Sequence, residues 1–176
     1  KNVFAFFCLG SVLYIFISLV SYSSLDPSLS SVSSLSGSIE NLGGPFGAYL
    51  SDALFSVVGI GAYLFLLVMS FVAVKQLFFY QPSNNTHKVI KVTSALVLLS
   101  SFSALCEFYY SGDYFPQSSS GGLVGALIFT NLSNIFGIVG SLIFIVIFFL
   151  TSISLTFSFS WLSIIDALGN GARYLI

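Results

Sequence analysis

Four long apolar runs alternate with shorter polar stretches along the chain. They cover approximately residues 3–22, 53–74, 89–108 and 135–157. A hydrocarbon core about 30 Å thick is crossed by roughly 20 helical residues. Backbone groups inside lipid must bond to one another, which favours helices over open strands. The pattern therefore predicts an all-α membrane protein whose domain, residues 1–160, holds four transmembrane helices.

A glycine-rich phrase occurs twice between the apolar runs. NLGGPFGAYL at residues 41–50 is repeated as SSGGLVGALI at 119–128. A shift of 78 residues carries Gly43, Gly44, Gly47 and Gly59 onto Gly121, Gly122, Gly125 and Gly137. In the runs ahead of the phrases, a shift of 80 residues carries Ser23 onto Ser103. The sequence thus predicts two parallel copies of one hairpin, each with an outgoing helix, an outer loop and a returning helix.

Each glycine phrase leads into apolar residues at helical spacing, with polar residues on the opposite face. The polar positions are Ser51, Asp52 and Ser56 in the first copy and Thr130, Ser133 and Asn134 in the second. This pattern predicts an interfacial helix on the outer face of each copy. Paired glycines suit the bend at its start because glycine accepts a positive φ, and Pro45 suits a first helical turn. Gly59 and Gly137 are expected to mark the join with the returning span.

Small residues four apart, at Gly43/Gly47, Gly121/Gly125 and Gly137/Ser141, permit close helix approach in lipid. Packing or bending is the favoured interpretation of these glycines, against ligand binding. The candidate hinge or interaction residues are Gly43, Gly44, Pro45, Gly47, Asp52, Gly59, Gly121, Gly122, Gly125, Gly137 and Trp161.

The few charges predict an orientation. In a four-span arrangement one side holds Lys1, Lys75, Lys88, Lys91 and Arg173. The other side holds Asp26, Glu40, Asp52, Glu107 and Asp113, and Asp166 is the one acid on the cationic side. By the positive-inside rule both termini are cytoplasmic. Residues 161–176, which begin with Trp161 and carry an apolar helical face, are then expected to form a cytoplasmic interfacial helix.

Candidate chemistry is sparse in this sequence. Only 6% of residues are charged and the net charge is −1, which argues against a nucleic-acid-binding surface. GGPFG and GGLVG lack the lysine of a phosphate loop, and His87, the sole histidine, lies in a polar connector. Cys8 and Cys106 are expected near opposite ends of their helices, too far apart for a disulfide. We expect no catalytic, cofactor-binding or metal-ligating residues.

Asp52 and Glu107 are the two acids next to apolar runs. An ionised group well inside lipid costs at least about 2.5–3.5 kcal/mol and is usually functional. Both residues lie near predicted outer ends, where interfacial solvation or a bond to a neighbouring helix end is the favoured interpretation. Because no other acid or base lies deep in a predicted span, a proton relay or ion channel is disfavoured.

Several stretches together resemble the N-terminal four-span membrane domain of the FtsK/SpoIIIE DNA translocases of bacteria. They are SLVSYSSLDP at 18–27, NLGGPFGAYLSD at 41–52, SGGLVG at 120–125, and Ser160-Trp161-Leu162 ahead of Asp166. The first glycine phrase is the most specific of them. The resemblance extends through most of the chain.

The resemblance implies a membrane anchor and septal scaffold that coordinates cell division with chromosome segregation in the bacterial inner membrane. A linker would lead to a hexameric cytoplasmic ATPase, so ATP, Mg and double-stranded DNA belong to a motor that this chain lacks. The implied partners are division-machinery membrane proteins, membrane lipid and further subunits of a homo-hexamer. A small membrane transporter or channel is the alternative, and a membrane enzyme has no nucleophile–base pair to support it.

Overall fold

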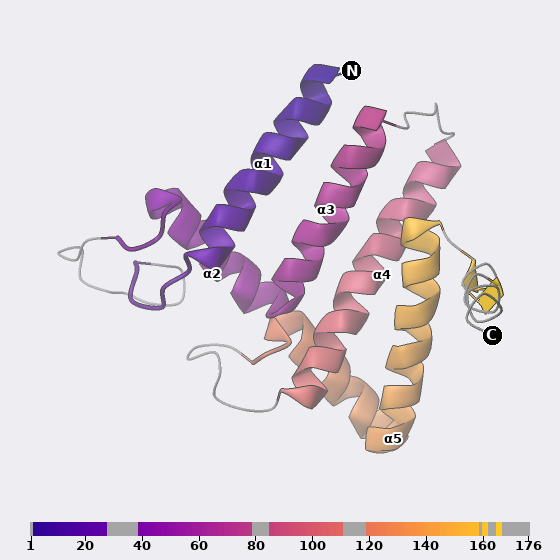
Figure 1. The fold of residues 1–176 in the computed structure, drawn as a ribbon. Helices are drawn as coiled ribbons and strands as arrows, with labels where there is room; N and C mark the ends of the chain where they lie inside the picture. The colour runs from indigo at the N-terminus through magenta and orange to yellow at the C-terminus, as the bar shows by residue number, and fades with distance from the viewer. Residues whose placement is uncertain are drawn as a thin grey trace, which may run out of the picture.

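The computed structural model describes residues 2–27, 39–78, 85–110, 119–158, 160, 161, 165 and 166. In this part of the chain the fold is all-helical, with five helices (Figure 1). They are α1 (Asn2–Val20), α2 (Gly44–Val58), α3 (Gly61–Phe78), α4 (Asn85–Tyr109) and α5 (Gly122–Phe157). The predicted all-α class is confirmed.

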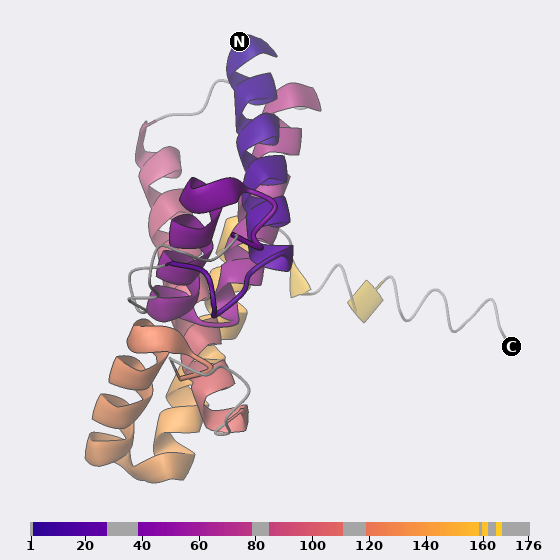
Figure 2. The same ribbon diagram turned by 90° about the vertical axis from the view of Figure 1, so that its left-hand side faces the viewer.

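Three of these helices, α3, α4 and α5, are long and apolar enough to cross a membrane, and α1 adds a shorter apolar helix over Phe6–Val20. The four lie side by side in the order α1, α3, α4, α5 (Figure 1), and each contacts the next in that row. A second view, turned by 90°, again places the bend of α5 at the end of the molecule farthest from the N-terminus (Figure 2).

Glycine bends separate a shorter helix from a longer apolar one in both copies of the repeat. Gly59, with φ 58° and ψ −135°, lies between α2 and α3. Gly137, with φ 71° and ψ 172°, divides α5 into residues 122–136 and 138–157. Neither conformation is helical, and the positive φ favours glycine because a Cβ would clash with the backbone.

The bends change the extent of two expected spans. Residues 53–58 of the expected span 53–74 belong to α2, so the apolar helix begins only at Gly61. In the second copy the expected span 135–157 contains the bend at Gly137. The hydrophobic run continues across each bend because apolar side chains face lipid or protein on both sides of it, and hydrophobicity alone therefore does not reveal the break.

The polar face of α2 is turned inward. Ser51 and Asp52 are buried, at 0% and 1% exposure, whereas Phe46 on the apolar face is 69% exposed. This is the reverse of an interfacial helix whose polar side meets water. A polar group in apolar surroundings needs a protein partner, while an apolar side chain can face lipid. In the second copy, by contrast, Thr130 and Asn134 are exposed.

A small aromatic core joins α1, α2 and α3 at one end of the row. Phe55 packs with Leu19 and Ala62, and its ring centroid lies 4.9 Å from that of Tyr22 and 5.7 Å from that of Tyr63. Such tilted and edge-on aromatic pairs add about 0.5–1.5 kcal/mol beyond the area they bury. The core fixes α2 against α1 and α3.

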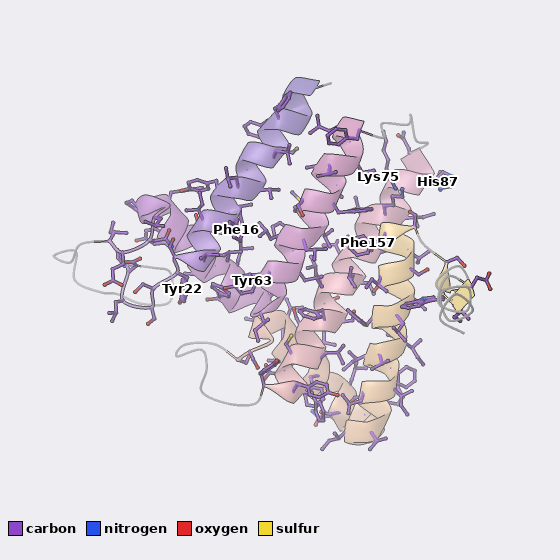
Figure 3. The ribbon with its side chains drawn as sticks, in the orientation of Figure 1. Phe16, Tyr22, Tyr63, Lys75, His87 and Phe157 are labelled. Atoms are coloured by element: carbon purple, nitrogen blue, oxygen red, sulfur yellow. The ribbon has the colours of Figure 1, made fainter. Side chains whose placement is uncertain are left out.

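The described lysines of α3 and α4 lie toward one end of these helices, and Glu107 lies toward the other. Figure 3 shows Tyr22 and Tyr63 toward the end where α2 lies, with Lys75 and His87 at the opposite end. Lys88 and Lys91 follow His87 in the first turns of α4, and Glu107 lies near that helix's other end. Several charges used in the sequence argument, Lys1, Asp113 and Arg173, lie outside the described residues.

Parts of the predicted loops and of the C-terminal helix also lie outside the described residues: 28–38, 79–84, 111–118, 159, 162–164 and 167–176. The sequence predicts a cytoplasmic connector over residues 81–87, but residues 85–87 are the first turn of α4. Within 161–176, Trp161 is helical and 42% exposed.

Candidate interaction site at the glycine turns

The first glycine turn packs directly on α1. A Cβ built on Gly43 would lie 2.5 Å from Ser18 Oγ, and one built on Gly47 would lie 2.8 Å from the same atom. A Cβ at either position would have to displace the Ser18 hydroxyl, so the glycines let the start of α2 lie close against α1. Tyr14 of α1 donates its hydroxyl to the Gly43 carbonyl at 2.7 Å.

Asn41 connects this turn to α1. Its side-chain oxygen accepts the Gly43 amide at 2.8 Å, and its Nδ2 donates to the Ser18 carbonyl at 2.9 Å. The Asp26 carboxylate accepts the backbone amides of Glu40 and Asn41 at 2.8 and 2.9 Å. A carboxylate that receives two amides forms stronger bonds than neutral acceptors do. The bonds of Asp26 and Asn41 therefore tie the end of α1 to the start of α2.

Asp52 lies within α2, more than two helical turns after its first residue, Gly44, and is buried. The Tyr22 hydroxyl, just beyond the end of α1, donates to its Oδ1 at 3.3 Å. Burial raises the pKa of Tyr22, and the Asp52 charge and hydrogen bond raise that pKa further. Tyr22 consequently keeps its proton and remains a donor to the carboxylate. Asp52 is thus buried at 1% exposure and bonded to a protein hydroxyl.

The second glycine turn packs on α4 in the corresponding way. A Cβ built on Gly121 or Gly125 would collide with the Ser103 carbonyl oxygen, and the latter would also lie 3.3 Å from the Ala104 nitrogen. Glu107 Oε2 accepts the Gly121 amide at 3.0 Å. This is a carboxylate bound to a helix end, one of the two arrangements expected for Glu107, and it suits the positive end of the helix dipole.

The two copies differ in register ahead of the glycines. Ser18 and Ser103 occupy the same place against their glycine turns, whereas the sequence alignment pairs Ser103 with Ser23. The segment from the serine to the first glycine is longer in the first copy, 18–43 against 103–121. The alignment therefore matched composition rather than contact, because similar serines recur every few residues in both outgoing helices.

The bend of the first copy rests on the glycine turn of the second. The Ile60 amide donates to the Ser120 carbonyl at 2.9 Å, and Ser103 Oγ donates to the Val58 carbonyl, also at 2.9 Å. A Cβ built on Gly122 would lie 2.5 Å from the Gly59 nitrogen. Two glycines with positive φ thus meet backbone to backbone. We call this contact the internal junction.

The remaining candidate residues are placed as follows. Pro45 is in the first turn of α2. Gly44 and Gly137 both have positive φ, and a Cβ built on either meets no described atom within 4 Å outside the immediate backbone. Trp161 lies apart from both glycine turns in sequence, beyond the end of α5. The structure therefore brings Gly59, Gly121 and Gly122 together and leaves Gly44 and Gly137 open.

The glycine turns do not fit a nucleotide phosphate. The Gly44 amide donates to the Asn41 carbonyl at 2.9 Å, and the Gly122 amide donates to the Ser119 carbonyl at 2.8 Å. The amides of Gly43 and Gly121 are bound by side chains, as described above. A phosphate site needs free amides at a helix start and a nearby cation. Among the described residues, no three His, Cys, Asp or Glu side chains group as a metal site.

Comparison with known proteins gives the family. Residues 1–169 match the family described as the 4TM region of DNA translocase FtsK/SpoIIIE. The chain belongs to this family. The match includes both glycine turns and all five helices. It confirms the resemblance carried by the glycine phrases.

Relatives of this FtsK/SpoIIIE region carry the same name. The chain is 30% identical over 170 residues to "DNA translocase FtsK 1" of Neisseria meningitidis serogroup B, covering 94% of this chain and 21% of that protein. It is 27% identical over 169 residues to "DNA translocase FtsK" of Pseudomonas syringae pv. tomato, covering 90% of this chain and 20% of that protein. No solved structure matches the chain.

The FtsK/SpoIIIE chain described here thus spans about a fifth of the length of these relatives, and the shared part is their membrane region. It is a multi-pass membrane region of a bacterial membrane protein. Sequence reasoning found the glycines, but it missed Ser18, Asn41 and Ser103, which hold the turns. The one available hint was their position among small and polar residues flanking apolar runs.

Proposed function

We propose that this region is the membrane anchor and septal scaffold of a DNA translocase that coordinates cell division with chromosome segregation. The observation that carries the proposal is the position of the buried charges. Among the described residues these are Asp26 and Asp52, and both hold α2 against the end of α1. These two carboxylates hold the proposed outer surface in place. Among the described residues, no buried charged side chain lies within the long helices α3, α4 and α5.

A fixed outer surface suits a scaffold. In the first copy α2 is held by Asn41, Asp26 and the aromatic core, and its apolar residues Phe46 and Tyr49 face outward. Apolar and aromatic side chains on a rigid element are well suited to bind other membrane proteins, because little conformational freedom is lost on contact. We infer that division-machinery membrane proteins and lipid are the partners of this surface.

The proposed topology has four spans arranged as two parallel hairpins with both termini in the cytoplasm. Lys75, Lys88 and Lys91 lie near the connector between α3 and α4, and cations favour the cytoplasmic side. The glycine turns then face the periplasm. In the whole protein a cytoplasmic motor, with ATP and Mg, would move double-stranded DNA, and the subunits would form a homo-hexamer in the inner membrane at the septum.

The alternative function, a small transporter or channel, finds less support. Solute passage requires a polar-lined path between the helices. Two shallow grooves on the described surface are lined mainly by apolar side chains: one by Phe7, Tyr14, Phe46 and Leu50 with neighbours, the other by Leu9, Phe16, Leu66 and Leu67 with neighbours. Both suit lipid tails or apolar protein contacts better than a solute.

The scaffold proposal is tested by locating this region alone, fused to a fluorescent protein, in dividing bacterial cells. A band at the septum supports it. Diffuse labelling of the whole membrane, with the fusion shown to be intact and inserted, contradicts it. A matched Gly125→Leu fusion, in which α5 cannot approach Ser103, is expected to lose the band while remaining in the membrane.

A further inference from the structure

We propose that a second copy of this chain docks head to tail on the first, with the Gly137 bend of one copy resting on the Gly43–Gly44 turn of the next. The internal junction supplies the template for this contact. The proposal rests on the geometry of the two repeats and is independent of the septal role.

The internal junction joins a bend to a turn. The bend at Gly59 belongs to the first copy of the repeat, and the turn at Gly121–Gly122 belongs to the second. Their contact is made largely by backbone atoms, including the 2.9 Å bond from the Ile60 amide to the Ser120 carbonyl, with one side-chain bond from Ser103 Oγ to the Val58 carbonyl. A contact of this kind depends on glycine and backbone shape more than on side-chain identity. It can therefore be made again wherever a second bend meets a second turn.

Both halves of a second junction are present, and the part of the chain that the structure describes leaves them uncovered. Gly59, Gly121 and Gly122 are buried, whereas Gly137 is exposed and Gly43 and Gly44 are only half-buried. Leu42 occupies the position of Ser120 in the repeat and is 80% exposed, against 4% for Ser120. The uncovered positions are those of the bend of the second copy and the turn of the first.

The uncovered glycines have the backbone conformation that the junction uses. Gly44 and Gly122 have φ of 67° and 63°, and Gly137 and Gly59 have φ of 71° and 58°. A Cβ built on Gly44 or Gly137 would meet no atom of the described residues within 4 Å, whereas one built on Gly59 or Gly122 would collide with the other copy's backbone. Open space at these two glycines leaves room for the backbone of a neighbour.

Within one chain the two open halves cannot meet. Figure 1 places the start of α2 beside α1, at one edge of the helix row, and the bend of α5 at the other edge. A protein partner for either half therefore has to come from another molecule, and a second copy carries the matching half. Such a head-to-tail contact uses different surfaces on the two partners, so it repeats from copy to copy and forms a ring where the rotation closes. The added copy continues the row, with its α1 next to α5.

Disulfide crosslinking in membranes tests this contact in the full-length protein. Cys8→Ser and Cys106→Ala remove the thiols of this region, and any cysteine elsewhere in the full-length protein is replaced as well. One tagged copy carries Leu42→Cys, and a differently tagged copy carries Ile138→Cys, the counterpart of Ile60. We expect oxidation to give mixed dimers at several times the level of either homodimer. Both side chains are largely exposed, so the substitutions leave the core intact.

Two controls define the outcome. Ile60→Cys with Ser120→Cys in one chain should crosslink internally, which shows that the fold and the oxidation are intact. Leu42→Cys paired with Phe78→Cys, which is exposed near the opposite end of α3, should not crosslink. Mixed dimers that are absent, or no more abundant than homodimers, while the internal pair crosslinks, would overturn the proposal. The crosslinking readout does not require a septum, so a failure of this proposal can be told apart from a failure of the localisation test.

Discussion

The Ile60 amide donates to the Ser120 carbonyl at 2.9 Å, and this bond ties the bend of the first repeat to the glycine turn of the second. A helix that breaks at Gly59 leaves backbone groups without their usual helical partners. In apolar surroundings such groups must bond elsewhere in the protein. The second repeat provides the partner, so the bend is a contact surface as well as a change of direction.

Gly125→Ala should lower the stability of the region, because the added Cβ would collide with the backbone of Ser103 in α4. Overpacking of this kind costs about 1–3 kcal/mol. Thermal unfolding of the detergent-solubilised region measures the change as a lower Tm.

The matched control for that change is Gly10→Ala. Gly10 lies within α1, where a Cβ meets nothing within 4 Å. Alanine in a helix interior is favoured over glycine by about 0.5–1 kcal/mol, so the Tm should stay the same or rise slightly. Equal losses for the two variants would contradict the close approach of α5 to α4.

Gly122→Ala and Gly44→Ala isolate the internal junction. Both positions have similar positive φ, so both variants carry similar backbone strain. At Gly122 the new Cβ would also lie 2.5 Å from the Gly59 nitrogen and 2.7 Å from the Val57 oxygen, whereas at Gly44 it meets open space. In monomeric, detergent-solubilised protein the Gly122 variant should therefore unfold at the lower temperature. A Gly44 variant as unstable as the Gly122 variant would argue against the junction.

Tyr22→Phe should destabilise the region because buried Asp52 loses a hydroxyl donor at 3.3 Å. Leaving a buried polar group with fewer partners costs about 1–3 kcal/mol. Tyr49→Phe is the control, since Tyr49 lies on the exposed face of α2. The Tm should fall for the first variant and change little for the second. Matching small effects would show that the hydroxyl bond to Asp52 adds little stability.

Asn41→Asp should loosen the first glycine turn. The amide Nδ2 that donates to the Ser18 carbonyl becomes an acceptor oxygen, which leaves that buried carbonyl without its donor. We expect a loss of about 1–3 kcal/mol, measured by thermal unfolding. Asn131→Asp is the control, because Asn131 is exposed and bonds only one turn back along its own helix. The account of Asn41 as a connector fails if both variants behave alike.

The sequence predicts the helices and the glycine bends well, for a physical reason. Membrane-crossing length and a requirement for positive φ are local properties, and they show directly in the apolar runs and in Gly44, Gly59, Gly122 and Gly137. Gly59 indicated the break inside the expected span 53–74, although the hydrophobic run continues across it.

The contacts of the glycine turns are not local, and the sequence predicts them poorly. Ser51 and Asp52 lie on a polar face that would suit water equally well, and only the packing of α2 on α1 turns that face inward. The pairing of Ser103 with Ser18 rather than Ser23 depends on how the outer segments are folded. Apart from the Ser103 hydroxyl bond to the Val58 carbonyl, the internal junction joins backbone atoms, which leave no trace in side-chain patterns.

The scaffold proposal depends on the glycine turns facing the periplasm and on the lysines that flank the connector between α3 and α4 facing the cytoplasm. α4 carries a site for this test at each end: exposed His87 in its first turn and exposed Tyr110 just beyond its last residue. Each is changed to cysteine in the Cys8→Ser, Cys106→Ala background, and intact spheroplasts are treated with a membrane-impermeant maleimide. We predict that the cysteine at 110 is labelled in intact spheroplasts and the cysteine at 87 only after permeabilisation. Labelling of position 87 in intact spheroplasts, with position 110 protected, would contradict the orientation and the periplasmic placement of the scaffold surface.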